Sequence, residues 1–476
     1  IVLQQAGFAL ALLYNYNHPK NVYYNNEEIK NLAIATVTFW QKRQHRDGSF
    51  DEYWPNEHGL PPTIFSLFSV VEVCKSLSIN DEKILSAIKK ASNYIIQNRE
   101  LGALNQEIAS MCALYNTSIL LKSEYIRSEA EKKLQMLLSS QDDEGWFREY
   151  EGADIGYLTV SLNFMMEYYL LSKDERAKDS MKKMILFIQY FVHPDGSLGG
   201  DYGSRNTEYF LPGGFEGASK FDQIGPLASS IVDLLIKYLE TNESMDDRYV
   251  THYVFPSFVR AAMIYAPRKS VSKLPFETIY EMQWKNSGLY VKSTAKYYLI
   301  SSIAKGGVTV IFDKKSKRRV VNDCGYRAIQ GKKIYVSNWL SKDYNFDISK
   351  NIINITSYFY AAKFHTPSPI QHFMLRVTSF FLKKKLIPIM KKIFIFPSAK
   401  GGISLNRKIT FGEKDVVIED IINSKSTLGL LKSNEGLSLR FCPSSKFFQT
   451  STLRRNRYPY SKENVTTDKI VKKILF

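Results

Sequence analysis

The stretch Gln141-Asp142-Asp143-Glu144-Gly145-Trp146-Phe147 has three counterparts in the first half of this 476-residue chain, at 44–50, 97–102 and 193–198. Each combines an acidic residue with a glycine, as in tight turns at helix ends, where glycine tolerates a positive φ. Their glycines are 43 to 54 residues apart, which leaves room for two helices and their connections. The recurrence therefore predicts a series of helical hairpins.

Amphipathic segments fill the intervals between these turns. In 27–43 and 63–77, apolar residues recur close to every 3.6 residues, the period of one helix face. Comparable segments cover 4–16, 81–98, 105–121, 124–140, 157–171, 176–192, 224–240 and 250–265. A hairpin cannot bury its apolar face alone, so neighbouring hairpins must pack side by side. We predict an incomplete (α/α)5–6 toroid over residues 1–284, with an open superhelix as the alternative.

The pattern changes after about residue 284. Segments rich in Val, Ile, Tyr and Phe lie at 297–303, 307–312, 333–339, 352–359, 416–421 and 437–441, and glycine pairs and Asn-Asp turns separate them. Such segments are typical of antiparallel strands joined by turns. We therefore predict a multidomain α+β protein, in which residues 285–476 form an antiparallel, sandwich-like β domain.

Charge divides the chain in the same way. Residues 1–250 carry 24 Lys and Arg against 34 Asp and Glu, whereas residues 251–476 carry 40 against 13. An excess of this size in one half indicates an anionic partner, which could be an acidic polysaccharide, a nucleic acid or a membrane surface. A basic amphipathic stretch, 373–397, is suited either to an anionic membrane surface or to an insertion packed on the sheet.

Several classes of function lack their sequence signals. The four cysteines (Cys74, Cys112, Cys324 and Cys442) lack the spacing of a zinc site, so we expect buried free thiols. No P-loop or nucleic-acid motif is present, and we expect no nucleic-acid partner. We expect no required cofactor; a structural divalent cation and the oligomeric state stay open. If a signal peptide precedes Ile1, the protein belongs in the periplasm, outside the cell or at the envelope.

Two loops concentrate polar groups that a simple connector would not need. The segment Gly199–Gly217 contains six glycines among nineteen residues, and the segment Trp146–Tyr157 precedes the next helix. Loops at the same end of successive hairpins line one mouth of a toroid, so we expect both to face one cleft. The candidate substrate-binding residues in them are Trp146, Arg148, Tyr150, Glu151, Asp154, Tyr157, Tyr202, Glu208 and Glu216.

A helical toroid followed by a basic β domain resembles the heparinase II/III-like polysaccharide lyases and related alginate lyases. The segments 143–147, 152–157 and 203–207 resemble uncharacterised relatives of that family. The resemblance implies β-elimination on a uronic acid. In that reaction hydrogen-bond donors neutralise the carboxylate, while a Tyr or His removes the neighbouring proton and a Tyr or His protonates the leaving oxygen.

This chemistry assigns candidate catalytic residues. By resemblance, Asn206 takes the neutralising role, and the planar cation of Arg205 beside it suits the same task. Candidates for the base and the acid are Tyr209, the pair His252-Tyr253, and His365 in the β domain. A packed lid with internal polar bonds is the alternative interpretation of the 199–217 loop.

Two other functions remain open. A glycoside hydrolase would need two opposed carboxylates, for which Glu151 or Asp154 with Glu208 or Glu216 are available. A polysaccharide-binding or assembly protein would keep the aromatic cleft and the basic surface without a working acid and base. Terpene cyclases also place Gln…Asp-Gly loops on helical toroids, but the Asp-rich motif that they need is absent.

Overall fold

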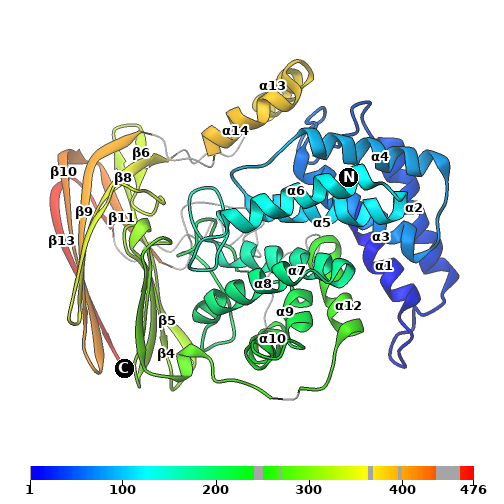
Figure 1. Ribbon diagram of the computed structural model, residues 1–476. Coiled ribbons are helices and arrows are strands. Elements are labelled where there is room, and N and C mark those ends of the chain that lie inside the picture. The colour runs from blue at the N-terminus through cyan, green and yellow to red at the C-terminus, as the bar shows by residue number, and fades with distance from the viewer. Residues whose placement is uncertain are drawn as a thin grey trace.

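The computed structural model describes residues 2–208, 210–240, 250–268, 270–362, 368–394, 399–435 and 461–476. Figure 1 shows a helical domain on one side and a β domain on the other, bridged at one edge by two helices. The predicted fold class is confirmed. Cys74, Cys112 and Cys324 are buried thiols outside any disulfide, as predicted, whereas Cys442 lies outside the described residues.

Inner and outer helices alternate along the first domain. The inner helices are α1 (Ala6–Asn15), α3 (Leu60–Ser76), α5 (Leu104–Leu121), α7 (Ile155–Ser172), α9 (Pro212–Ala218) and α12 (Phe255–Ile264). Each packs on the next, and α12 returns to α1, so the inner helices close a ring. The outer helices are α2 (Glu27–Arg43), α4 (Glu82–Gln97), α6 (Glu124–Ser140), α8 (Glu175–Ile188) and α10 (Gly225–Leu239).

Burial separates the two kinds of helix. The middle turns of α3, α5 and α7 are buried on nearly every side, whereas α2 and α6 bury a narrow stripe. A helix that is apolar all round belongs inside a domain, and one with a single apolar stripe belongs on its surface. Short 3-10 segments, η1 (Val2–Gln5) and η2 (Gln189–Phe191), and a π-helical turn, Val250–Val254, complete this domain.

Helix α9 is the main departure from the predicted hairpins. It lies within the predicted 199–217 loop, and it makes α10 the partner of α9 rather than of α12. Glycine lowers helix propensity, which hid this helix in the sequence. The glycines instead allow close packing on α7, because a Cβ on Gly214 would lie 2.8 Å from the Leu162 side chain and one on Gly217 would overlap Met166.

Three of the four recurring turns share one hydrogen-bond scheme. Gly48, Gly145 and Gly196 all have positive φ, and each donates its N–H to the carbonyl three residues earlier. In the first two turns a glutamine, Gln44 or Gln141, also donates to a carbonyl of the next outer helix. The fourth, at 97–102, differs because its Gly102 has no positive φ and it connects α4 to α5 in only a few residues.

The β domain is one continuous antiparallel sheet that folds over on itself. Its strands follow the order β1-β2-β3-β4-β5-β6-β8-β9-β10-β13, with β7 on β8, β11 on β5 and β12 on β11. The bounds are β1 (Tyr280–Trp284), β2 (Leu289–Ser293), β3 (Tyr297–Ser302), β4 (Val308–Asp313), β5 (Arg318–Gln330), β6 (Lys333–Val336), β7 (Asn345–Ser349), β8 (Ile352–Ala362), β9 (Lys400–Phe411), β10 (Asp415–Leu428), β11 (Leu430–Glu435), β12 (Ser461–Lys462) and β13 (Val465–Leu475).

The two halves of this sheet face each other around a common core. Leu299 and Ile311 from the first strands pack in one buried cluster with Ile353, Ile409 and Ile418 from β8, β9 and β10. Two faces packed in this way make a sandwich. Strand β1 lies just before the predicted domain boundary at residue 284, yet it pairs with β2 from Tyr280 onward. The predicted strand at 437–441 lies outside the described residues.

The basic segment 373–397 contains two helices, α13 (Pro369–Leu382) and α14 (Leu386–Phe394), inserted between β8 and β9. They extend from the β domain across to the helical domain (Figure 1). The hydroxyl of Ser379 donates to the carbonyl of Pro55 at 2.8 Å, so the insertion contacts the toroid. Among the described helices, none combines the length and apolar character that a bilayer crossing requires.

Replacement of Gly145 tests the role of the recurring turns. At φ +104°, a Cβ would run into the carbonyl of Lys183, so we expect Gly145→Ala to lower the free energy of unfolding by about 2–4 kcal/mol. Gly331→Ala is the matched control, because Gly331 also has positive φ but no atom lies within 4 Å. That control should cost only about 1 kcal/mol. Equal losses in denaturant unfolding would contradict the close-approach argument.

Candidate functional site

Four of the outer-to-inner connections lie at one end of the toroid, which we call the mouth. They are residues 44–59, 98–103, 141–154 and 189–211. The β domain and its inserted helices contact every one of them, through Ser379 to Pro55, Lys384 to Asn98, Ser287 to Glu144, and Lys305 to the 199–211 connection. The mouth is therefore the place where the two domains meet.

Asp154, the last residue of the third connection, binds the fourth connection and the start of α7. Its carboxylate accepts from the N–H of Tyr157 at 3.2 Å, which caps α7, and from the N–H of Arg205 at 2.7 Å. The hydroxyl of Thr207 also donates to it. Burial raises the pKa of Asp154, while these donors act to lower it. This carboxylate is committed to holding the 199–211 connection beside the start of α7.

Lys305 holds the same connection from the β domain. Its ammonium is fully buried and donates to the carbonyls of Asp201 and Gly203 and to Oδ1 of Asn206 at 2.6 Å. A buried cation needs such acceptors to replace water. Asn206 itself is 2% exposed and has a φ of +61°. Its amide oxygen therefore serves the joint between the domains.

Tyr150 and Arg205 reach the surface of the mouth together. The Arg205 guanidinium carbon lies 4.8 Å from the centroid of the Tyr150 ring, and Nζ of Lys391 lies 5.6 Å from the same centroid. Lys391 also forms an ion pair with Glu100. Both Tyr150 and Arg205 are half-buried, and Tyr150 has a φ of +60°. A strained, half-buried tyrosine with two cations against its ring is the candidate ligand-binding feature of this cluster.

Glu149, which precedes Tyr150 in the chain, is a buried carboxylate close to Arg205. One of its carboxylate oxygens accepts from the N–H of Asn105 at 2.8 Å, at the start of α5. Burial raises the pKa of Glu149 well above its ordinary range, although nearby Arg205 acts to lower it. Its 1% exposure places it behind the surface groups rather than in contact with solvent.

The other candidates in these loops have varied positions. Trp146 is buried, and its indole donates to Glu144 at 3.0 Å beside the joint with Ser287. The hydroxyl of buried Tyr202 lies 2.8 Å from Nε2 of His193. Arg148 and Glu151 are exposed, and Tyr157 and Glu208 are half-buried. Of this set, the contacts assign Trp146 and Tyr202 to packing within the fold.

His252 and Tyr253 belong to the π-helical turn that packs on η1, α1 and α12. His252 is buried, and the Tyr253 ring lies 5.9 Å from that of Phe65. Both stay candidates on this turn. Tyr209 and His365 lie outside the described residues.

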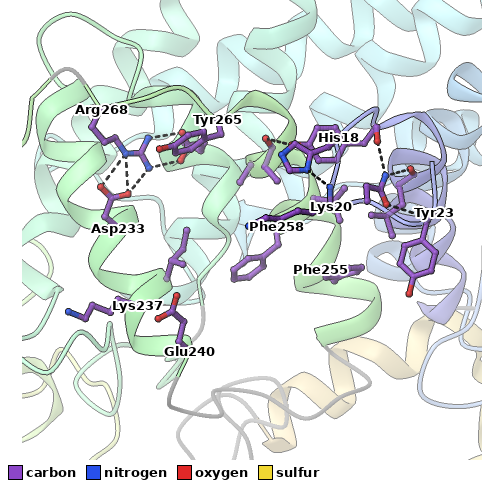
Figure 2. A pocket seen from close by; sticks show the side chains of 18 residues that line it. His18, Lys20, Tyr23, Asp233, Lys237, Glu240, Phe255, Phe258, Tyr265 and Arg268 are labelled. Atoms are coloured by element: carbon purple, nitrogen blue, oxygen red, sulfur yellow. Dashed lines mark hydrogen bonds and ion pairs between the residues drawn. The ribbon is translucent and has the colours of Figure 1, made fainter. Parts of the chain in front are cut away.

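Glu216 lies away from the mouth. Its carboxylate is 2% exposed and forms two hydrogen bonds, of 2.7 and 2.8 Å, with Arg268, which also pairs with Asp233. Figure 2 shows this ion-pair group at one side of a hollow of about 840 Å³ between the α1–α2 connection, α10 and α12. Glu216 stays a prediction as a substrate contact, and in the structure its ion pair links α9 to the segment after α12.

Sequence reasoning missed Lys305, Lys391, Glu100 and Glu149 as parts of the mouth. Lys305 carries no local signal, because its acceptors lie about a hundred residues earlier. The basic run around Lys391 is evident in the sequence, but the ion pair between Lys391 and Glu100 joins residues 291 positions apart. Within the described residues, no group of three or more His, Cys, Asp and Glu is arranged to hold a metal ion.

Comparison with known proteins places this architecture. Residues 12–214 match the family model of the ulvan lyase N-terminal domain. The Streptomyces coelicolor A3 chondroitin AC lyase in complex with chondroitin sulphate aligns with a TM-score of 0.59 at 8% identity, over 91% of this chain and 63% of that one. A Paenibacillus xanthan lyase aligns at 0.55 and 11% identity, over 91% and 42%. Heparinase III aligns at 0.50 and 9% identity, over 86% and 62%.

These likenesses confirm the resemblance to polysaccharide lyases that combine a helical toroid with a β domain. At such low identity the solved structures show a shared fold. The chain spans less than two thirds of the length of each of these three proteins. No curated protein matches its sequence.

The Lys305 joint can be tested by Lys305→Met, which keeps the length of the side chain and removes its donors. We expect the free energy of unfolding to fall by about 2–4 kcal/mol, because three buried acceptors lose a charged donor. Limited proteolysis should then cut the 199–211 connection faster. Lys332→Met, at an exposed position of the β domain, is the control. Unchanged stability and proteolysis would show that the joint does not depend on Lys305.

Proposed function

We propose that this chain is a polysaccharide lyase that cleaves a uronate-containing acidic polysaccharide by β-elimination. The observation that carries the proposal is the placement of Tyr150 against Arg205 and Lys391 at the mouth of a lyase-like toroid. The match of residues 12–214 to the ulvan lyase N-terminal domain supports the same reaction class.

The proposed reaction begins with the carboxylate of the sugar. The proton beside a carboxylate is weakly acidic, because its removal places further negative charge on that group. Arg205 is suited to receive the carboxylate through its planar donors, which would stabilise the developing enolate-like charge. Lys391 adds a second cation on the same tyrosine ring, although its ion pair with Glu100 offsets part of that charge.

Tyr150 is our candidate for the base. A phenolate needs nearby positive charge, and this tyrosine has two cations against its ring. In the proposed step, the phenolate takes the proton beside the carboxylate, a carbon–carbon double bond forms, and the bond to the leaving oxygen breaks. The phenol then returns its proton to that oxygen. One residue would thus serve as base and then as acid.

Asn206 receives a different role from the one that the resemblance implied. Because it is 2% exposed and its amide oxygen accepts from Lys305, we assign it to positioning the connection that carries Arg205. Asp154, which accepts from the Arg205 N–H, would act in the same way. His252 and Tyr253 remain candidates for a second acid, since they lie on the next inner element.

The charge of the chain supports an acidic substrate. Residues 251–476 carry 40 basic against 13 acidic side chains, and the β domain that most of them form borders the mouth. Two of the proteins that share the fold are a chondroitin AC lyase and a xanthan lyase. A fold alone does not fix a substrate, so the uronate polymer is part of the proposal.

The hydrolase alternative depends on paired carboxylates. Of those considered, Asp154 is committed to backbone N–H groups and Glu216 to Arg268, while Glu208 lies 3.7 Å from Arg319. Glu151 is exposed, and Glu208 is the carboxylate left to pair with it among those considered. These commitments favour elimination over hydrolysis. A binding or assembly role would keep the same mouth without turnover.

Incubation with a panel of acidic polysaccharides tests the proposal. We expect ultraviolet absorbance to rise as unsaturated uronate ends form, and Tyr150→Phe to lower kcat by roughly 10²–10⁴-fold. Arg205→Ala should raise KM and lower kcat, whereas Arg205→Lys should restore part of both, since one cation remains. Tyr125→Phe, on the outer helix α6 with its side chain 60% exposed, is the control.

Other results would redirect the assignment. New reducing ends without absorbance would indicate hydrolysis. Binding of polysaccharide with neither product would favour a binding protein. Full activity in Tyr150→Phe would remove this tyrosine as the base while leaving the reaction class intact.

A further inference from the structure

The inserted helices α13 and α14 are rich in basic residues, of which the proposed reaction uses only Lys391. Residues 368–394 contain Arg376, Lys383, Lys384, Lys385, Lys391 and Lys392 and no acidic residue. Their helices are linked through the 3-10 turn Lys383–Lys385. The basic residues thus gather around the junction and the end of the insertion.

The apolar side chains of α13 face solvent. Ile370, Phe373, Met374, Val377 and Phe381 recur at the spacing of one helix face, and Phe380 lies beside them. Their exposed fractions run from 39% for Val377 to 75% for Phe381. Scattered apolar residues on a surface are ordinary, but a row of large ones along one helix marks an interaction surface.

Contacts on the other side hold this face outward. Ser379 is buried and donates to the carbonyl of Pro55, and Leu386 is 6% exposed. Lys384 donates to Asn98 at 3.3 Å, and Lys391 pairs with Glu100. The helices therefore rest on the mouth through their polar side and one leucine, and turn the phenylalanines away from it.

We propose that the exposed face of α13, together with the lysines that follow it, docks on an anionic lipid surface. A helix with aromatic and aliphatic residues on one face and basic residues beside them lies in the interface of a bilayer, with its apolar face among the acyl chains. Lysines near such a surface are attracted to acidic head groups. The absence of any acidic side chain in 368–394 fits this partner.

The orientation of α13 and α14 determines where the mouth would lie relative to a lipid surface. Because α13 and α14 contact the connections at Pro55, Asn98 and Glu100, a docked helix keeps the mouth close to the lipid surface. Lipid binding by this face does not depend on the proposed lyase reaction, so each can fail without the other.

Flotation with lipid vesicles tests the proposal. The full chain is mixed with vesicles of phosphatidylcholine alone, or with roughly one third phosphatidylglycerol. We expect at least about tenfold more protein on the anionic vesicles, with a loss of binding at high salt. The variant Phe373→Ser/Phe380→Ser/Phe381→Ser should lose this binding, and Lys385→Glu/Lys392→Glu should lose the preference for anionic lipid.

Leu32→Ser/Phe39→Ser on α2 is the matched control, since these side chains are 49% and 47% exposed on another helix. All variants alter exposed positions, and circular dichroism and thermal unfolding confirm that each is folded. Equal binding by the phenylalanine variant and the α2 control would overturn the proposal. So would self-association that the phenylalanine variant abolishes without any vesicle binding, because a second copy would then cover this face.

Discussion

The buried ammonium of Lys305 joins the β domain to the helical domain at the mouth. It comes from the β domain and has its acceptors in the connection between α8 and α9. A cation without water must find oxygen atoms in the protein, and the carbonyls of Asp201 and Gly203 and the amide of Asn206 supply them. The connection cannot leave this position without stranding the charge. Asp154 fixes the same connection from the toroid side, so Arg205 is held between two buried anchors.

The recurring turns explain why polar groups can gather at the mouth at all. The three turns with a positive-φ glycine bring that glycine against the carbonyls or side chains of the next outer helix, which sets the spacing between neighbouring hairpins. The long connections that follow the turns then fall at one end, where inner helices begin. Strain in Tyr150, the cations beside it and the buried Glu149 all belong to this end. The scaffold is regular, and the connections are where the chain departs from regularity.

The insertion of α13 and α14 gives the mouth a third component. One side supplies Lys391 to the Tyr150 ring and to Glu100, while the other side exposes phenylalanines. The same two helices thus carry part of the candidate site and the proposed lipid-facing surface. Different basic residues serve the two roles. Lys385 and Lys392 are exposed and belong to the proposed lipid-facing surface, whereas Lys391 is paired with Glu100 at the candidate site.

The sequence by itself determined the alternation of helices, the change to strands near residue 284 and the acidic and basic halves. These are properties of local periodicity and composition, which neighbouring residues specify. It also located the two polar loops, and Tyr150, Arg205 and Asp154 within them. The sequence did not predict helix α9, because its glycines disfavour a helix locally. They are favourable only where α7 packs closely against them.

Only the tertiary structure decided which of these polar groups meet. Asn206 turned toward Lys305 and Glu216 toward Arg268, while Lys391 came to Tyr150 from the far half of the chain. The separation of these partners runs from tens to hundreds of residues. The packing of the domains determines which charged group lies closest to a given side chain, and no pattern along the chain specifies that partner.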